Sequence, residues 1–433
     1  MKRNALIFMC LISICVLPNI LPAQSFEQFK KEFIDGYTSL NLPAINYGYR
    51  DYFSTIPSQQ QLQKQRVFFT GIEKALPSIK ENGLSPVQKN EFRAIAYEAH
   101  FNLKRVALEE AWVANGRGIP LNGLYTLPNH EAWCQYFVQK FTSTDITPPQ
   151  VFEMGKNEVA RVKKEITRLQ HVLGFNDEGV FYKHLTDSSF FITDKNEIIK
   201  RFKIIDSIAR KNLAGFVGQA NIPVVYPMEW PGAGPATPPG IYLNHANNAF
   251  GKDVFQFNFF GGMYNRRVMD WIYMHEAIPG HHLQASVRPG NPLLELFLYP
   301  GNFEGWGCYV EYYGKELGLY ADAYAELGKW EWDLVRSLRL VLDAGIHYYG
   351  WSKQDALKYW KENIKGQDGI AEREVNRVTN WAGQALSYKV GAAYILDLQQ
   401  TWQKKNPGKP LKDFRGRYLS AGMLPLLVMK GAI

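Results

Sequence analysis

The sequence predicts a mainly α-helical fold that surrounds a central cleft and carries a small antiparallel β element. Helical periodicity dominates the first half of the chain. Amphipathic patterns cover residues 87–114 and 149–173, and each predicts one long helix. An earlier aromatic stripe at helical spacing consists of Phe26, Phe29, Phe33 and Tyr37. We expect residues 24–215 to form a helical N-terminal part that packs against a metal-bearing part, residues 216–433, as one cleft-forming unit.

The extreme N-terminus has the layout of a secretory signal peptide. Two basic residues precede an apolar run, and the small residues that follow offer a cleavage site near Ala23. This run is short for a bilayer span, and no later segment is long and apolar enough for one. The bulky Ile14 before Cys15 disfavours a lipid anchor. We therefore expect residues 1–23 to be removed and the chain to be exported, to the periplasm or the extracellular space.

The charge pattern argues against a nucleic-acid partner. Two positive charges leave with the predicted signal peptide, so the net charge falls from +8 to +6. The remaining lysines and arginines are scattered among acidic residues, which is typical of solvated helix faces. No basic stripe with interleaved aromatic residues is present. Cys134 and Cys308 remain, and both a disulfide and two buried thiols fit the sequence.

Two short segments predict the β element. Residues 240–245 and 253–260 are rich in aromatic and β-branched residues, and residues 246–252 between them suit a turn. Such a hairpin either offers a free edge to an extended peptide or simply caps the fold. The proline-rich residues 231–240 predict a surface loop at the border of the cleft.

A histidine cluster in the segment HEAIPGHHLQ, residues 275–284, predicts a metal site. A zinc peptidase needs two imidazoles on one ion, an adjacent carboxylate that takes a proton from water, and a third ligand from elsewhere. The usual helical pattern is H-E-x-x-H, which places both histidines on one face. His275 and Glu276 begin this pattern, but Pro279 occupies the place of the second histidine.

The Pro-Gly pair predicts an interruption of this helix. Proline removes a backbone hydrogen bond, and Gly280 permits backbone angles that other residues resist. If two residues are extruded, His281 becomes the second ligand, and if three are extruded, His282 does. We favour His281, because the pattern then keeps its closing Gly-His pair.

A second helix offers the third ligand. Glu304, Cys308 and Glu311 share one face of the helical pattern that begins near residue 303. Glu304 is the expected ligand, since a carboxylate on a facing helix completes a tetrahedral site with water. Glu311 is the competitor, and it better suits the role of accepting a histidine N–H.

The chain resembles a bacterial family of unknown function, DUF885, whose members carry the pattern HEAxPGHHLQ. Further segments resemble conserved blocks of that family in the same order, and they are residues 147–162, 304–320, 338–352 and 383–391. The stretched histidine motif is also similar, more distantly, to those of helical oligopeptidases and carboxypeptidases with His, His and Glu ligands. The resemblance implies a zinc-dependent peptidase of helical metallopeptidase-like fold.

The resemblance also singles out Tyr388 and His347 as candidate donors to the oxygen that becomes negative when water attacks a peptide carbonyl. For each, packing in the core with a satisfied polar group is the alternative. Arg377 suits a substrate carboxylate, although Glu374 lies three residues earlier and is able to neutralise it.

The sequence therefore predicts an exported metallopeptidase that hydrolyses short peptides with one Zn²⁺ per chain. The predicted metal ligands are His275, His281 and Glu304, with Glu276 as general base and Tyr388 or His347 as oxyanion donor. The alternatives are a zinc hydrolase of a non-peptide or cell-wall amide or ester, and an inactive peptide-binding protein of the same fold. The sequence leaves open the oligomeric state, the end from which peptides are cut, and manganese or cobalt in place of zinc.

Overall fold

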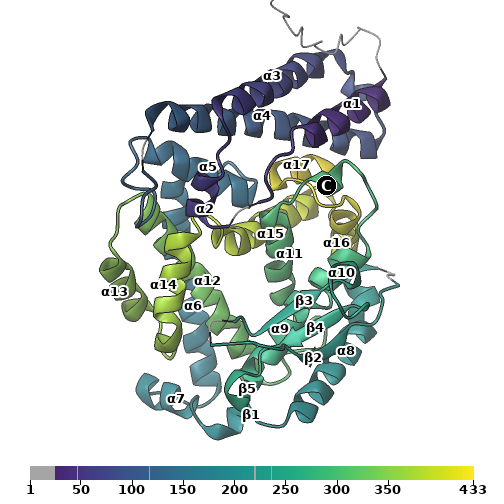
Figure 1. The fold of residues 1–433 in the computed structure, drawn as a ribbon. Helices are drawn as coiled ribbons and strands as arrows, with labels where there is room; N and C mark the ends of the chain where they lie inside the picture. Colours follow the sequence, from purple (N-terminus) through teal and green to yellow (C-terminus); the bar gives the residue numbers. More distant parts are fainter. Residues whose placement is uncertain (1–24, 46, 117, 219–220, 236) are drawn as a thin grey trace, which may run out of the picture.

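The fold is mainly α-helical, as predicted, and is described here from a computed structural model (Figure 1). The structure describes residues 25–433 apart from 46, 117, 219–220 and 236. The predicted signal peptide, residues 1–23, lies outside the described residues. Among the described residues, no helix is both long and apolar enough to cross a bilayer.

Eight α-helices precede the main sheet in the part of the chain that the structure describes. They are α1 (Phe26–Ser39), α2 (Tyr49–Ser54), α3 (Gln59–Ala75), α4 (Pro86–Asn115), α5 (His130–Thr142), α6 (Pro148–Val172), α7 (Glu178–His184) and α8 (Lys195–Val217). The predicted helices at the N-terminus are confirmed, because α1 buries its phenylalanine stripe, and α4 and α6 begin within one residue of their expected starts. Capping boxes at Ser85 and Thr147, each followed by proline, fix those starts.

The main sheet contains the predicted hairpin and one strand that was not predicted, β2, and two further short strands, β1 and β5, pair separately. The strands are β1 (Phe191–Ile192), β2 (Tyr226–Glu229), β3 (Gly240–Leu243), β4 (Val254–Phe257) and β5 (Tyr264–Asn265). β3 and β4 pair antiparallel, with Tyr242 opposite Phe255. β2 adds to the other side of β4 in parallel, so β3 is left as an edge strand. Proline within β2 suits its position at the opposite edge.

Nine helices follow the sheet and carry most of the candidate site. They are α9 (Met269–Glu276), α10 (His281–Ser286), α11 (Pro300–Glu311), α12 (Ala323–His347), α13 (Lys353–Asn363), α14 (Ala371–Asn380), α15 (Leu386–Lys405), α16 (Leu411–Ser420) and α17 (Leu426–Ala432). α11 and α15 pack along each other in the middle of the molecule, and α12 packs along α6 (Figure 1).

Close backbone contact holds α11 against α15. A Cβ atom added to Gly305 would lie 2.6 Å from the backbone of Gly391, and one added to Gly391 would lie 2.1 Å from the carbonyl oxygen of Gly301. Only glycine permits helices to approach this closely. This packing fixes α11, which carries Glu304, against the helix that carries Tyr388.

The hydrophobic core runs through both predicted parts of the chain. α8 buries Phe202 and Phe216 in the same cluster as β4, α9 and α11. The division at residue 215 stays a prediction.

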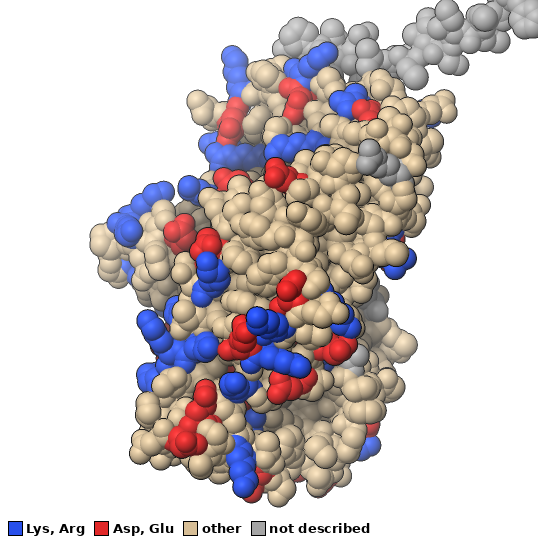
Figure 2. All heavy atoms as spheres, turned by 90° about the vertical axis from the view of Figure 1, so that its left-hand side faces the viewer, with Lys and Arg blue, Asp and Glu red and all other residues tan. Residues whose placement is uncertain are grey.

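On the face shown in Figure 2, basic and acidic side chains are interspersed.

Candidate metal centre and active-site cleft

A cavity of about 570 Å³ opens between the β3 edge and helices α9, α11, α12, α14 and α15. Aromatic and apolar side chains line much of it, and polar groups gather on two sides. One polar group consists of His275, Glu276, His281 and Glu304. The other consists of Arg336, Arg339, Arg373, Glu374 and Arg377. A largely apolar cavity with a few convergent polar groups is typical of a ligand site.

The helix that carries His275 is interrupted where the sequence predicted it. α9 ends at Glu276 and α10 begins at His281. Gly280 makes this possible, because a Cβ atom there would lie 1.8 Å from the carbonyl oxygen of His275. Trp306 of α11 donates its indole N–H to the carbonyl oxygen of Pro279 at 2.8 Å. The interruption brings the rings of His275 and His281 to a centroid distance of 4.7 Å.

Three predicted ligands converge on one point. The Nε2 atoms of His275 and His281 lie 3.4 and 3.5 Å from the same Oε2 atom of Glu304. The three ligand atoms all lie within 4.8 Å of one another. Both histidines are buried, and Glu304 is partly open to the cavity. Burial by itself would raise the pKa of Glu304, but its interactions with His275 and His281 hold it well below its usual range. Two imidazoles and an ionised carboxylate are a donor set that suits zinc.

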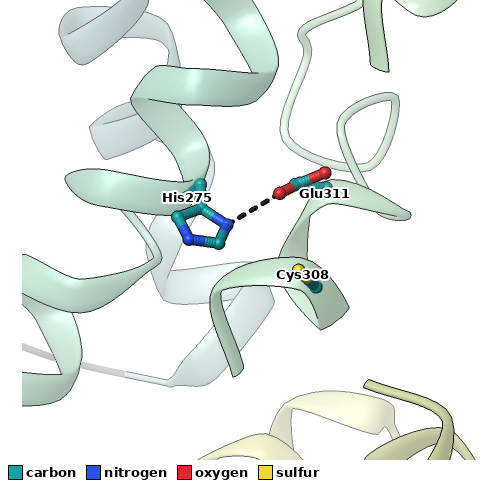
Figure 3. A group of neighbouring side chains, drawn as sticks. All are labelled: His275, Cys308 and Glu311. Carbon is teal, nitrogen blue, oxygen red and sulfur yellow. Dashed lines mark hydrogen bonds and ion pairs between the residues drawn. The ribbon is translucent and has the colours of Figure 1, made fainter. Parts of the chain in front are cut away.

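The second nitrogen of the His275 ring, Nδ1, is held by Glu311 (Figure 3). The Nδ1 atom of His275 lies 2.7 Å from Oε1 of Glu311, and Oε2 of Glu311 accepts a hydrogen bond from Nη1 of Arg336 at 2.6 Å. A carboxylate that accepts the second N–H of a ligand histidine fixes the ring orientation and leaves the other nitrogen free for a metal. Gly307 allows this contact, because a Cβ atom there would lie 2.6 Å from the His275 ring.

A second group of potential ligands consists of His275, Cys308 and Glu311 (Figure 3). This group is a poorer metal site for two reasons. Both oxygens of Glu311 already have hydrogen-bond partners. Burial raises the pKa of the Cys308 thiol, whereas a metal ligand must be a thiolate. Cys134 and Cys308 are both free and buried, so the structure contains no disulfide between them.

His282 points away from the converging ligands. Its Nε2 atom lies 3.5 Å from Oδ2 of Asp253, and its ring packs edge-on against Tyr242. Burial lowers the pKa of His282 to about 4, so its imidazole is neutral at pH 7. His281, by contrast, stacks face to face on Phe303 at a centroid distance of 3.7 Å. The structure thus groups His281 with His275 and Glu304, and leaves His282 outside that group.

Glu276 lines the cavity beside the three converging side chains. Its Oε2 atom accepts a hydrogen bond of 2.9 Å from the backbone N–H of Tyr242 on the β3 edge. Burial raises the pKa of Glu276, although the neighbouring His281 and His275 oppose this shift. A carboxylate with a raised pKa beside a metal site is suited to accept and return protons.

The two predicted oxyanion donors lie in different places. Tyr388 lines the cavity, and its ring is stacked against that of His275 at a centroid distance of 6.3 Å. His347 lies away from the cavity, in the core between α5 and α14. Its Nδ1 atom accepts from the backbone N–H of Leu124 at 3.2 Å, and its Nε2 atom lies 3.0 Å from the carbonyl oxygen of Val378. His347 therefore packs in the core with both ring nitrogens hydrogen-bonded, which is the alternative to an oxyanion donor.

The profile of one bacterial family of unknown function, DUF885, matches residues 51–433. The chain belongs to the DUF885 family. The predicted resemblance is thereby confirmed, and it covers every residue of the candidate site. No curated protein gives a significant sequence match.

Two solved structures are similar in fold to this chain. One is described as a candidate lipoprotein from Colwellia psychrerythraea, with a TM-score of 0.65 and 21% identity over 94% of this chain and 73% of that one. The other is described as a candidate lipoprotein of unknown function from Shewanella oneidensis, with a TM-score of 0.61 and 17% identity over 94% and 88% of the two chains. At these identities the likeness concerns the fold.

Sequence reasoning missed three contributors to this DUF885 site. Arg336 neutralises Glu311, the backbone of Tyr242 binds Glu276, and Trp306 fixes the interrupted segment. Arg336 lies one turn before Arg339 on α12, so its position on a buried helix face was the available signal. The backbone contact of Tyr242 left no signal, since any residue supplies an N–H.

Proposed function

We propose that this protein is an exported zinc-dependent metallopeptidase that hydrolyses short peptides. The observation that carries the proposal is the convergence of His275, His281 and Glu304 beside Glu276 at the wall of one cavity. The interrupted helix and the histidine held by Glu311 are features expected of a metal centre rather than of a solvated surface cluster.

A zinc ion held by His275, His281 and Glu304 would supply the Lewis acid that activates water and polarises the scissile carbonyl. Glu276 takes the proton from the attacking water and returns it to the leaving amine. Its hydrogen bond to the Tyr242 N–H keeps the carboxylate facing the cavity. Glu311 and Arg336 keep the His275 ring in one orientation.

Tyr388 stabilises the negative charge that develops on the carbonyl oxygen. Its hydroxyl accepts a hydrogen bond from Nη2 of Arg377 at 3.3 Å, so its own proton is free to be donated to the substrate. Burial and the nearby Glu304 carboxylate raise the pKa of Tyr388, which keeps that proton in place at neutral pH. A donor aimed at the developing oxyanion lowers the barrier substantially.

The cavity walls suit a peptide. Gly240, Ile241 and Tyr242 of β3 line the cavity, and β3 is an edge strand. An extended peptide is able to pair its backbone with such an edge. The volume of about 570 Å³ fits a few residues rather than a folded protein.

Export rests on two observations. Residues 1–23 have the layout of a signal peptide. The structures from Colwellia psychrerythraea and Shewanella oneidensis are both described as candidate lipoproteins, which are exported proteins. Periplasmic or extracellular residence fits both observations.

Mass spectrometry of a short-peptide library tests the proposed function. The mature protein is incubated with the library after loading with zinc, after treatment with a chelator, and after restoration of zinc. We expect cleavage only in the zinc-containing samples. Chelator-resistant cleavage would contradict a metal mechanism. No cleavage by zinc-loaded protein would leave the metal centre with a non-peptide or cell-wall amide or ester, or with a binding role.

A further inference from the structure

An arginine cluster lies on the wall of the cavity formed by α12 and α14. Arg339 on α12 and Arg373 and Arg377 on α14 line the cavity together with one carboxylate, Glu374. Arg336 of α12 also lines this wall but is paired with Glu311, so the other three guanidinium groups share a single acidic side chain on it. An excess of positive charge inside a partly apolar cavity favours an anionic ligand.

The Glu374 carboxylate is occupied by two of these arginines. Its Oε2 atom accepts from Nε of Arg339 at 2.7 Å, and its Oε1 atom accepts from Nη2 of Arg373 at 2.9 Å. The two hydrogen bonds use both oxygens of a carboxylate that is almost fully buried. Glu374 thus forms its hydrogen bonds with Arg339 and Arg373, and its effect on Arg377 is limited to attraction through space.

Arg377 has only neutral hydrogen-bond partners among the described residues. Its Nη2 atom donates to Oε1 of Gln384 at 2.9 Å and to the hydroxyl of Tyr388 at 3.3 Å. Its Nε–H is buried without a hydrogen-bond partner in the part of the chain that the structure describes. The guanidinium lies over the rings of Trp381 and Tyr388, which hold its plane. Because Nη2 is already engaged twice, a carboxylate in the cavity would be bound by the uncompensated charge of this guanidinium and by its remaining N–H groups.

We infer that Arg377 binds the terminal α-carboxylate of the substrate, so that the protein removes residues from the carboxyl end of peptides. This inference rests on the proposed function. A single side chain, Tyr388, connects Arg377 to the metal centre, since it bonds Arg377 and stacks against His275. An extended residue spans about 3.3–3.6 Å. We expect one or two residues to fit between Arg377 and the scissile bond, and these residues become the product.

Paired peptides test this assignment. N-acetylated hexapeptides that end in a free carboxylate are compared with the same peptides ending in a carboxamide, which has no charge. For zinc-loaded wild type we expect kcat/KM to be at least about 50-fold higher for the acids, because a buried charged hydrogen bond is lost with the amides. The released product should be one C-terminal amino acid or a C-terminal dipeptide.

Arginine variants show whether Arg377 is the cause. In Arg377→Met the acid-to-amide ratio should fall to within about threefold of unity, and Arg377→Lys, which keeps the charge without the fork, should lie between. Arg201→Met is the control, since Arg201 is an exposed residue of α8 paired with Glu197. It should retain the wild-type ratio. If Arg377 only positions Tyr388, Arg377→Met will slow acids and amides equally, and that outcome overturns the assignment.

A binding measurement separates this inference from the proposed function. Fluorescence anisotropy with labelled acid and amide peptides uses the zinc-loaded Glu276→Gln protein, in which turnover is removed. Acids should bind at least about 50-fold more tightly than amides, and the difference should vanish when Arg377→Met is added. Equal binding of acids and amides overturns the carboxylate site, even if peptides are cut. Selective binding without any peptide cleavage by wild type keeps the carboxylate site and refutes the peptidase.

Discussion

Replacement of Glu311 by glutamine tests how the metal centre is oriented. Glu311 is 1% exposed and bonds both Nδ1 of His275 and Nη1 of Arg336. Glutamine keeps the shape and one acceptor oxygen but removes the charge. Loss of the carboxylate that orients a ligand histidine weakens metal binding by about 10–100-fold. We expect that loss in the zinc affinity of Glu311→Gln.

The same substitution also leaves the Arg336 guanidinium buried without a counter-charge. Breaking a buried ion pair from one side costs about 3–5 kcal/mol of folding free energy. The double variant Glu311→Gln/Arg336→Met removes both charges and should recover most of that stability. It should not recover zinc affinity, because the orienting carboxylate is still absent. The two effects are therefore separable within one set of variants.

Zinc affinity is measured by competition with a chelating dye, and stability by urea denaturation of the metal-free proteins. Cys308→Ala is the matched control on α11, and it should leave zinc affinity within about threefold of wild type. Zinc affinity that is unchanged in Glu311→Gln would refute the orienting role. A much larger loss in both Glu311→Gln and Cys308→Ala would place the metal in the His275, Cys308 and Glu311 group instead.

Two further predictions follow from the geometry. His281→Gln should abolish stoichiometric zinc binding in elemental analysis, whereas His282→Gln should retain it, and the reverse pattern would exchange their roles. Burial raises the pKa of Asp343 from 3.8 to about 7, against the hydrogen bond from Gly383. In the unfolded state this carboxyl ionises near pH 4, whereas in the folded state it stays protonated until about pH 7. Its burial therefore lowers the free energy of unfolding as pH rises from about 4 to 7, by at most about 4 kcal/mol. In denaturation experiments, the free energy of unfolding of Asp343→Asn relative to wild type should be higher at pH 7.5 than at pH 4.5. A difference that is the same at both pH values would contradict this reasoning.

The elements with local signals were predictable from the sequence. The boundaries of α4 and α6 are set by capping boxes and prolines within a few residues of each start. The interruption before His281 was also predictable from a local signal, because Pro279 and Gly280 both disfavour a continuous helix. Spacing on a single helix was enough to propose Glu304 as a ligand.

Contacts between distant segments were not predictable in this way. The parallel pairing of β2 with β4 joins strands separated by the β3 segment, and nothing in the local pattern of Tyr226–Glu229 specifies its partner. Pairing of Glu374 with Arg339 rather than Arg377 depends on how α12 and α14 pack. His347 and Tyr388 were equally plausible donors, and only the tertiary fold separates a core position from a cavity wall.

The most direct test of the central claim compares peptide turnover by wild type and Glu276→Gln at matched zinc content. The three proposed ligands are intact in the variant, so it should bind one zinc ion per chain as wild type does. If Glu276 is the general base, turnover should fall by at least about 100-fold while zinc content is unchanged. Turnover that survives in the zinc-loaded variant, or zinc that is lost with the substitution, would contradict the proposed roles of Glu276 and of the metal centre beside it.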